Sequence, residues 1–422
     1  MGFLSQELKK KDKKGLLNQN ISQIGYPTKL LPLDFRNGYQ VNVCDAETGK
    51  VVRRWANVGL FGGSFITIAG KPGVAKTAFC VQVAAEICRN YKESEIYHLD
   101  LEGSSNISRM MKLANYSYKE MENKFNYFND YHYIEDIFQL ICNIADTKCT
   151  NKEVFSTKTG VYDEFGREEE QLVPTVVIID SIPMLVTKDL EGEMNMAGMT
   201  YDGRRARVIS QFYRRLRPVL QRANIIVMAI NHINAKIDIN PMAKSQSQIM
   251  YLKQDEATPG GNAPLYLAQT FLKFVQCGKY VDDVDGFNGF KVRCELIKSK
   301  TNRGGSSCIL VYDMETGFDP YRTILEHIKE QGLLEGRNPK SYFRSNPDLK
   351  FDSRKFSQLC REDPKLFKEA MLCAAPSLYS YLANAEDLNY LEEKDDEVMK
   401  RLESSNKLEE SLKSGDYENG NV

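Results

Sequence analysis

The sequence Gly70-Lys71-Pro72-Gly73-Val74-Ala75-Lys76-Thr77 lies between an apolar run, residues 65 to 69, and a run with helical spacing, residues 78 to 91. A strand, a tight glycine-containing loop and a helix, in this order, form the context of a phosphate-binding loop. Backbone N–H groups of such a loop point at phosphate oxygens, and the helix N-terminus adds a partial positive charge. The stretch therefore predicts a nucleotide site in an α/β domain. A Gly/Pro turn followed by a chance Lys-Thr pair is the alternative.

Two side chains of this stretch carry the expected chemistry. Lys76 would reach the β- and γ-phosphates of ATP, and the Thr77 hydroxyl would hold Mg²⁺. Ala75 stands where a second glycine is usual, and its methyl group fits only if the backbone there lies near the helical region. The predicted nucleotide-binding residues of the loop are Gly70, Lys71, Pro72, Gly73, Val74, Ala75, Lys76, Thr77 and Ala78.

The composition is that of an ordinary globular protein. The chain has 422 residues, of which 42% are hydrophobic and 27% charged, and its net charge is −1. A nucleic-acid-binding surface must therefore be local. The ten cysteines include no C-x-x-C pair, which favours a reducing compartment over a zinc or disulfide framework. With no apolar run long enough to span a membrane, we expect a cytoplasmic protein, in the host cytoplasm if a phage encodes it.

Repeated strand and helix patterns between residue 62 and about residue 321 predict a mostly parallel central sheet flanked by helices. The expected strands are 65–69, 95–101, 175–180, 225–231, 270–275, 290–298 and 308–312. The polar stretch 146–173 is expected to form a surface hairpin or loop before the central strand. The predicted organisation is a small strand-rich N-terminal segment at 1–60, which is a candidate subunit-interface element, a core at 61–321, a small helical domain at 322–385 and an acidic tail at 386–422.

Polar residues follow several of these apolar strands. Asp180 ends 175–180, where a second Mg²⁺-organising carboxylate is expected. Glu102 follows the strand after the loop helix, and the C-terminal ends of parallel strands share one ligand-binding edge. Because Asp180 is followed by Ser rather than Glu, Glu102 is the candidate to polarise an attacking water. A surface Glu at the start of a helix is the alternative.

Two further residues are candidates at the same site. Arg109 lies seven residues after Glu102 and is placed to stack on an adenine face, with a solvated helix charge as the alternative. His232 follows the strand 225–231, where an imidazole can donate to a γ-phosphate and report its presence. A lone histidine is more often structural, so its position carries the argument.

Together these segments resemble the RecA family of DNA strand-exchange ATPases, in a phage-type branch similar to UvsX. The resemblance rests on the phosphate-binding loop, Asp100-Leu-Glu102-Gly103 with Arg109, Val-Val-Ile-Ile-Asp180-Ser181, and Asn231-His232 followed by Thr258-Pro-Gly260-Gly261-Asn262-Ala263. The Gly-Gly-Asn-Ala piece is the least generic and is similar to the end of the second DNA-binding loop of RecA. The resemblance covers about residues 60 to 315. It departs at Ala75, and at His232, where bacterial RecA proteins carry Gln.

The resemblance implies a RecA-like P-loop ATPase core that uses ATP and Mg²⁺ and polymerises on single-stranded DNA to pair it with duplex DNA. A helical homo-oligomeric filament, a single-strand-binding protein and a loading mediator are the implied partners. Two DNA-binding loops are implied, at 188–207 and 235–257, with cations for phosphates and apolar or aromatic groups for bases. The candidate DNA-binding residues are Arg204, Arg205, Arg207, Lys236, Lys244, Tyr251, Lys253, Gly260, Gly261 and Asn262.

The implied catalytic set is Glu102, Lys76, His232, Lys298 and Lys300. The last two resemble paired lysines that reach a neighbour's ATP in a RecA filament; cations on an edge strand are the alternative. A ring-forming replicative helicase on the same fold is a rival, and Arg303 suits its arginine finger, although only about 60 residues precede the core. A non-catalytic RecA-like mediator is a second rival, which the intact Lys76, Asp180 and Glu102 disfavour.

Overall fold

The structure is a computed structural model that describes residues 24–44, 51–162, 168–188, 199–235, 256–261, 263–282 and 286–385. The lysines of residues 1–14 and the acidic tail at 386–422 lie outside these ranges. Much of the two candidate DNA-binding loops does so too. No helix in the described ranges is long and apolar enough to cross a membrane.

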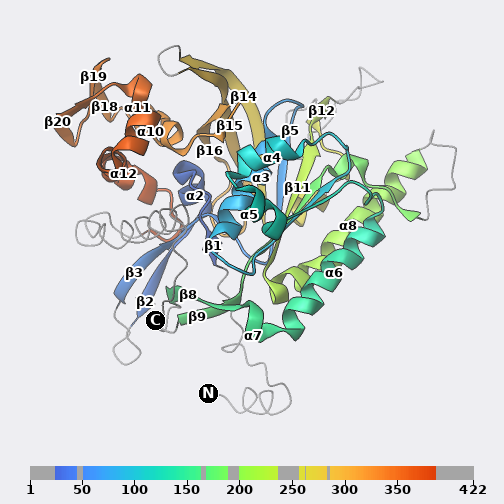
Figure 1. Cartoon of the computed structure of the whole chain (residues 1–422). Coiled ribbons are helices and arrows are strands. Elements are labelled where there is room, and N and C mark those ends of the chain that lie inside the picture. Colours follow the sequence, from blue (N-terminus) through green and yellow to red (C-terminus); the bar gives the residue numbers. More distant parts are fainter. Residues whose placement is uncertain are drawn as a thin grey trace, which may run out of the picture.

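A nine-stranded sheet organises the core, in the order β17-β16-β15-β14-β5-β11-β10-β6-β7 (Figure 1). The strands from β14 to β7 pair in parallel, and β15, β16 and β17 extend the sheet in antiparallel fashion. The bounds are β5 Phe65–Gly70, β6 Ile96–Asp100, β7 Phe125–Phe128, β10 Thr175–Asp180, β11 Ile225–His232, β14 Thr270–Asp282, β15 Phe287–Ser299, β16 Ser306–Asp313 and β17 Gly317–Phe318. The mostly parallel α/β core is confirmed.

The sheet separates two apolar cores because successive side chains of a strand point to opposite faces. Ile178 and Phe79 belong to the core on one face, whereas Val177 and Leu216 belong to the core on the other. The first face is covered by α3 (Lys76–Arg89), α4 (Ile107–Ala114) and α5 (Tyr118–Lys124), and the second by α6 (Ile134–Thr150) and α8 (Met199–Ala223) (Figure 1). Continuous apolar strands are expected where both faces are buried.

The stretch 146–173 begins as the end of α6 and then forms α7 (Lys152–Phe155) and a hairpin of β8 (Ser156–Tyr162) and β9 (Glu168–Leu172). The predicted hairpin is therefore confirmed, although it starts about ten residues later than the polar stretch does. The strand β7 was not predicted, because four residues give too short an alternation to recognise.

The C-terminal region was predicted to be helical, and this is incomplete. Besides α10 (Pro320–Glu330), α11 (Phe356–Glu362) and α12 (Pro364–Tyr379), it contains an antiparallel sheet of β18 (Leu334–Arg337), β19 (Lys340–Phe343) and β20 (Asn346–Phe351). These strands are short, and most of their residues are exposed or half-buried. They therefore lack the apolar alternation that marks a strand in a sequence.

The N-terminal segment is mixed rather than purely strand-rich. It contains β1 (Gly25–Tyr26), α2 (Leu31–Asn37), β2 (Tyr39–Cys44), β3 (Val51–Asn57) and β4 (Leu60–Phe61). Leu31 and Phe35 of α2 share a core with Ile324, Phe343 and Leu378 of the C-terminal region. The two ends of the described chain thus pack together, so the predicted boundaries at 60 and 321 separate segments that share a core.

Candidate functional site

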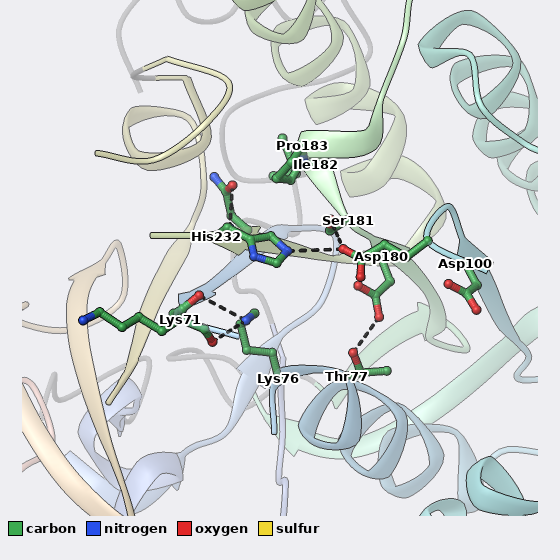
Figure 2. Close-up of polar contacts among 12 residues, drawn as sticks. Lys71, Lys76, Thr77, Asp100, Asp180, Ser181, Ile182, Pro183 and His232 are labelled. Carbon is green, nitrogen blue, oxygen red and sulfur yellow. Dashed lines mark hydrogen bonds and ion pairs between the residues drawn. The ribbon is translucent and has the colours of Figure 1, made fainter. Parts of the chain in front are cut away.

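The ends of parallel strands bring the predicted nucleotide site together (Figure 2). The strand β5 leads directly into the loop at residues 71–75, and α3 begins at Lys76. In the sheet register, His232 lies opposite Gly70 and Asp180 lies opposite Asp100. The loop and the ends of β6, β10 and β11 therefore meet at one edge of the sheet, as the sequence predicted.

The amine of Lys76 is buried inside the loop. Its Nζ donates hydrogen bonds to the backbone oxygens of Gly70, at 3.1 Å, and Lys71, at 2.8 Å. Burial lowers the pKa of Lys76, and the carboxylates of Asp180 and Glu102 oppose that shift. The loop thus holds a cation at its centre, where phosphate oxygens can replace the two carbonyl acceptors.

Thr77 and Asp180 form the candidate metal site. The Thr77 hydroxyl donates to Oδ2 of Asp180 at 2.6 Å, from the first turn of α3 to the end of β10. Burial raises the pKa of Asp180 to about 6; Glu102 and Asp100 add to the rise, whereas the Thr77 hydrogen bond and Lys76 oppose it. A hydroxyl and a carboxylate so close together are the hard oxygen ligands that Mg²⁺ uses beside nucleotide phosphates, so these residues fit the ion.

Glu102 is joined to two neighbours at the sheet edge. The Ser181 hydroxyl donates to Oε1 of Glu102 at 2.6 Å, and Nε2 of His232 lies 3.2 Å from the same oxygen. Sequence reasoning placed Glu102 and His232 at one edge but did not single out Ser181. The available signal was its position directly after the strand-ending Asp180.

Asp100 shapes the turn that presents Glu102. Its carboxylate accepts hydrogen bonds from the backbone N–H groups of Gly103, at 3.0 Å, and Ser105, at 2.8 Å, and from the Tyr127 hydroxyl at 2.9 Å. Burial works against ionisation here, but the bonds from Ser105 and Tyr127 prevail and lower the pKa of Asp100. A fixed turn after β6 keeps Glu102 near Ser181.

His98 is a buried neighbour of this site that the sequence analysis missed. Its Nε2 lies 4.0 Å from Oδ2 of Asp180, and burial lowers its pKa to about 4. The imidazole is therefore neutral at pH 7. The signal in the sequence was a histidine at an inward position of an otherwise apolar strand.

The backbone at Ala75 differs from the expectation in its handedness. Its φ of 62° and ψ of 31° are helical but left-handed. A non-glycine residue in this region carries a cost of about 1–2 kcal/mol, because its Cβ approaches a carbonyl oxygen. The residue is allowed here, but it is strained in a way that glycine would not be.

Arg109 reaches from α4 to the far end of β16. Its guanidinium donates to the Tyr312 hydroxyl at 2.8 Å and to the backbone oxygen of Glu315 at 3.2 Å. Asn106 caps the helix by accepting a bond from the Arg109 backbone N–H at 3.1 Å. The stacking of Arg109 on adenine stays a prediction.

The return of the second candidate DNA-binding loop is bonded to the nucleotide edge. The side-chain amide of Asn231 donates to the backbone oxygen of Pro259 at 3.0 Å. Gly260 and Gly261 have φ values of 86° and 69°, which favour glycine. Of this loop's candidates, Lys236, Lys244, Tyr251, Lys253 and Asn262 lie outside the described residues.

The described arginines of the first candidate DNA-binding loop lie on α8. The guanidinium of Arg205 donates to the backbone oxygens of Ile182, at 3.1 Å, and Pro183. It is thereby tied to the segment that follows Asp180, whereas Arg204 and Arg207 lie on the same first turns of the helix. Their role in DNA binding stays a prediction.

Lys298 and Lys300 do not join this site within one chain. Phe271 pairs with both Lys298 and Thr67, near the start of β5, whereas Gly70 ends that strand and pairs with Phe274. The Nζ of Lys298 donates to the backbone oxygens of Leu265 and Tyr266, at 3.0 and 2.5 Å, in α9 (Ala263–Tyr266). The two lysines therefore lie near the start of β5, at the opposite end of the strands from the phosphate-binding loop.

Comparison with known proteins finds one similar family. A family model described as the RecA N-terminal domain matches residues 172–307. This part of the chain is similar to the RecA family. The matched region contains Asp180, His232, Lys298 and Lys300, whereas the phosphate-binding loop lies before it.

Several curated proteins with RecA in their names are similar to part of the chain. One is "Protein RecA" of Nitrobacter winogradskyi, 26% identical over 269 residues, which cover 56% of this chain and 69% of the relative. Another is "Protein RecA" of Thermus aquaticus, 28% identical over 196 residues, covering 46% and 53%. A "Mitochondrial DNA repair protein recA homolog" of Dictyostelium discoideum is 27% identical over 182 residues, covering 42% and 36%. In the last two cases the matched part spans about half or less of the RecA-type relative.

Proposed function

We propose that the chain is an ATP-dependent homologous recombinase that polymerises on single-stranded DNA and promotes pairing and strand exchange with duplex DNA. The observation that carries the proposal is the meeting of Lys76, the Thr77–Asp180 pair and the Glu102–His232 contact at one edge of a RecA-related sheet. A phage-type branch similar to UvsX remains part of the proposal.

The residues at this edge have distinct roles in binding and hydrolysis. MgATP supplies the γ-phosphoryl group and the metal charge. Lys76 provides the counter-charge for the phosphates, and Thr77 and Asp180 provide oxygen ligands for Mg²⁺. Glu102 orients and polarises the attacking water. These assignments follow from residue type, position and the contacts described above.

The contact of His232 with Glu102 provides a sensor for the γ-phosphate. Both Ser181 and His232 contact the same Glu102 oxygen, so that oxygen is occupied in this arrangement. An imidazole N–H attracted to a γ-phosphate would leave this oxygen, and a water molecule could then donate to it in place of His232. His232 follows Asn231, whose side chain holds Pro259 at the return of the second loop. A shift of His232 would therefore be transmitted to the DNA-binding segment.

The distance of Lys298 and Lys300 from their own phosphate-binding loop supports an action on a neighbour. A group supplied by an adjacent subunit to a phosphoryl-transfer site can raise the rate by ~10³ or more. Hydrolysis would then depend on assembly, and single-stranded DNA would stimulate it by aligning adjacent subunits.

Electron microscopy with single-stranded DNA and a slowly hydrolysed ATP analogue tests the proposal. A helical filament is the expected result, and a closed ring would favour a replicative helicase instead. Stimulation of ATP hydrolysis by single-stranded DNA, lost in Lys76→Ala, is the accompanying biochemical result. A chain that binds DNA but shows no hydrolysis would support a RecA-like mediator.

A further inference from the structure

Three cations lie near one another at the opposite end of the strands from the phosphate-binding loop. Lys298 pairs with Phe271 of β14 one residue before β15 ends, Lys300 follows β15, and Arg217 lies on α8. Arg217 and Lys300 line one pocket together with Ser64 and Gln269. Burial, followed by the charges of Lys300 and Arg217, lowers the pKa of Lys298 to about 8. The three side chains are therefore close enough to repel one another.

No carboxylate neutralises this group within the described part of the chain. Lys298 donates only to two backbone carbonyls, and neither Lys300 nor Arg217 has a side-chain hydrogen bond or ion pair with a described residue. Three uncompensated like charges raise the electrostatic free energy of the folded chain. An anion placed among them would remove that cost, so the arrangement is suited to bind one.

The segment that carries the two lysines is anchored by partly buried hydrogen bonds. Oδ1 of Asn37 accepts from the Ser299 hydroxyl at 2.8 Å, and the Asn37 backbone oxygen accepts from the Thr301 hydroxyl at 2.8 Å. The Asn302 amide donates to the backbone oxygens of Gly38 and Tyr381, both at 2.7 Å. A side chain held on an anchored backbone loses less conformational entropy when a ligand binds.

The position of the cluster limits the possible sources of the anion. The chain's own nucleotide loop lies at the other end of the strands. Arg204, near the first candidate DNA-binding loop, precedes Arg217 by 13 residues on α8, which corresponds to ~20 Å along the helix axis. Neither the chain's own ATP nor DNA held by Arg204 therefore lies near the cluster. Lys298 contacts α9, which follows the return of the second candidate DNA-binding loop, so DNA held by that loop is the rival source. The proposed function favours a phosphate group brought by a second copy of the chain, and the binding of labelled DNA separates the two sources.

We propose that Arg217 acts with Lys298 and Lys300 as a three-cation site for the phosphates of a nucleotide bound to a second copy of the chain. The inference rests on the proposed function, because it requires assembly of adjacent subunits. Arg217 contributes what the lysines lack, since a planar guanidinium can donate two parallel hydrogen bonds to one phosphate.

Substitution of the arginine tests its part in hydrolysis. Arg217→Ala is expected to reduce DNA-stimulated ATP hydrolysis about a hundredfold, the lower end of the range for loss of one group that stabilises developing charge. Arg217→Lys should recover part of the rate. Arg222→Ala is the matched control, because Arg222 lies on the same helix but its guanidinium is paired with Asp146 at 2.5 Å. Its rate should stay close to wild type. A rate for Arg217→Ala equal to that of Arg222→Ala would overturn the inference.

Two further measurements identify the phosphate and exclude a folding defect. Binding of labelled single-stranded DNA, measured by fluorescence anisotropy with the slowly hydrolysed analogue, should be unchanged in Arg217→Ala. A loss of DNA binding in proportion to the loss of hydrolysis would assign Arg217 to DNA and overturn the inference. The melting temperature should equal or exceed that of wild type, because one of three repelling charges is removed; if it falls, Arg217→Gln, which keeps most of the side-chain stem, replaces the alanine variant.

Mixed assemblies test whether the arginine acts on a neighbour. In a mixture of the two variants, a Glu102→Gln subunit can supply its Arg217 to the nucleotide of an adjacent Arg217→Ala subunit, which still has Glu102. Activity should therefore partly return. No return, although each variant co-assembles with wild type, would overturn the inference.

A parallel mixture of Glu102→Gln with the double variant Lys298→Ala/Lys300→Ala tests the proposed function separately. Recovery in this mixture but not in the Arg217 mixture would refute the role of Arg217 alone. Recovery in neither would refute the action of the lysines on a neighbour.

Discussion

Replacement of Asp180 by Asn is expected to stabilise the nucleotide-free protein at neutral pH. The carboxyl group is buried, with a side chain only 5% exposed, and burial raises its pKa from 3.8 to about 6. At pH 7 it is nevertheless ionised, so the folded chain carries the cost of a buried charge. Asn has nearly the same shape, and its oxygen can still accept the hydrogen bond from Thr77.

The size and pH dependence of this effect follow from the pKa difference. The pKa of this carboxyl group rises from 3.8 to about 6 on folding, so the folded protein loses about 3 kcal/mol of stability when the group ionises. The native state binds the proton more tightly than the unfolded chain does. Stability from this group is therefore fully present below about pH 4, falls between pH 4 and 6, and is lost above pH 6. Asp180→Asn should exceed wild type by up to about 3 kcal/mol at pH 7 and by little near pH 4.

Urea unfolding between pH 4.5 and 8, with a chelator and without nucleotide, measures the difference. The chain has a single tryptophan, Trp55, which packs against the core of the sheet and provides the fluorescence signal. Asp100→Asn is a matched control on the neighbouring strand. Its carboxylate has a lowered pKa, so the amide should destabilise the protein at neutral pH. If Asp180→Asn is no more stable than wild type at pH 7, or if its advantage persists unchanged at pH 4.5, the reasoning is refuted.

A second arm of the same experiment adds MgATP. A ligand that binds only the folded state stabilises it by about 2.7 kcal/mol at a concentration of 100 times Kd. Wild type should gain this stabilisation, and Asp180→Asn should gain less because a metal ligand has been removed. An equal gain in both proteins would remove Asp180 from the metal site.

Three further changes test the site and the ends of the chain. Glu102→Gln should keep ATP and DNA binding while slowing hydrolysis by about 10²-fold or more; loss of nucleotide binding in a filter or calorimetric assay would make Glu102 structural. Ala75→Gly should raise the free energy of unfolding by about 1 kcal/mol, because it relieves a φ of 62°; a lower melting temperature would contradict that strain. Removal of residues 386–422 should leave ATP hydrolysis intact and tighten single-stranded DNA binding at low salt, since an acidic segment competes with DNA for cations. Weaker binding after truncation would exclude such competition.

The parallel-sheet rule predicted the nucleotide edge because it depends only on where strands end. Lys76, Asp180, Glu102 and His232 each follow or precede an apolar run, so a linear pattern was enough to bring them to one edge. The chemistry between them was harder to predict. The hydrogen bond from Ser181 to Glu102 joins residues 79 apart, and its existence depends on how two adjacent strand ends turn.

Most features that could not be predicted from the sequence depend on contacts between residues far apart in the chain. Arg109 meets Tyr312 across 203 residues, and no periodicity within α4 indicates that partner. The chain reverses its direction between β14 and β15, which pair in antiparallel fashion. The end of the sheet at which Lys298 and Lys300 lie therefore depends on the register of this pair. The strands β18 to β20 were missed because they are short and largely exposed, so tertiary packing rather than local pattern defines them.

The hydrogen bonds of Asn302 fasten two distant parts of the chain to one loop. Its side-chain amide holds residue 38 and residue 381 at the same time, directly beyond the two lysines. Local opening of either terminal region would break one of these bonds, so the order of this loop and the docking of both ends are linked equilibria. A change that loosens either terminal region would therefore weaken the cation cluster from a distance.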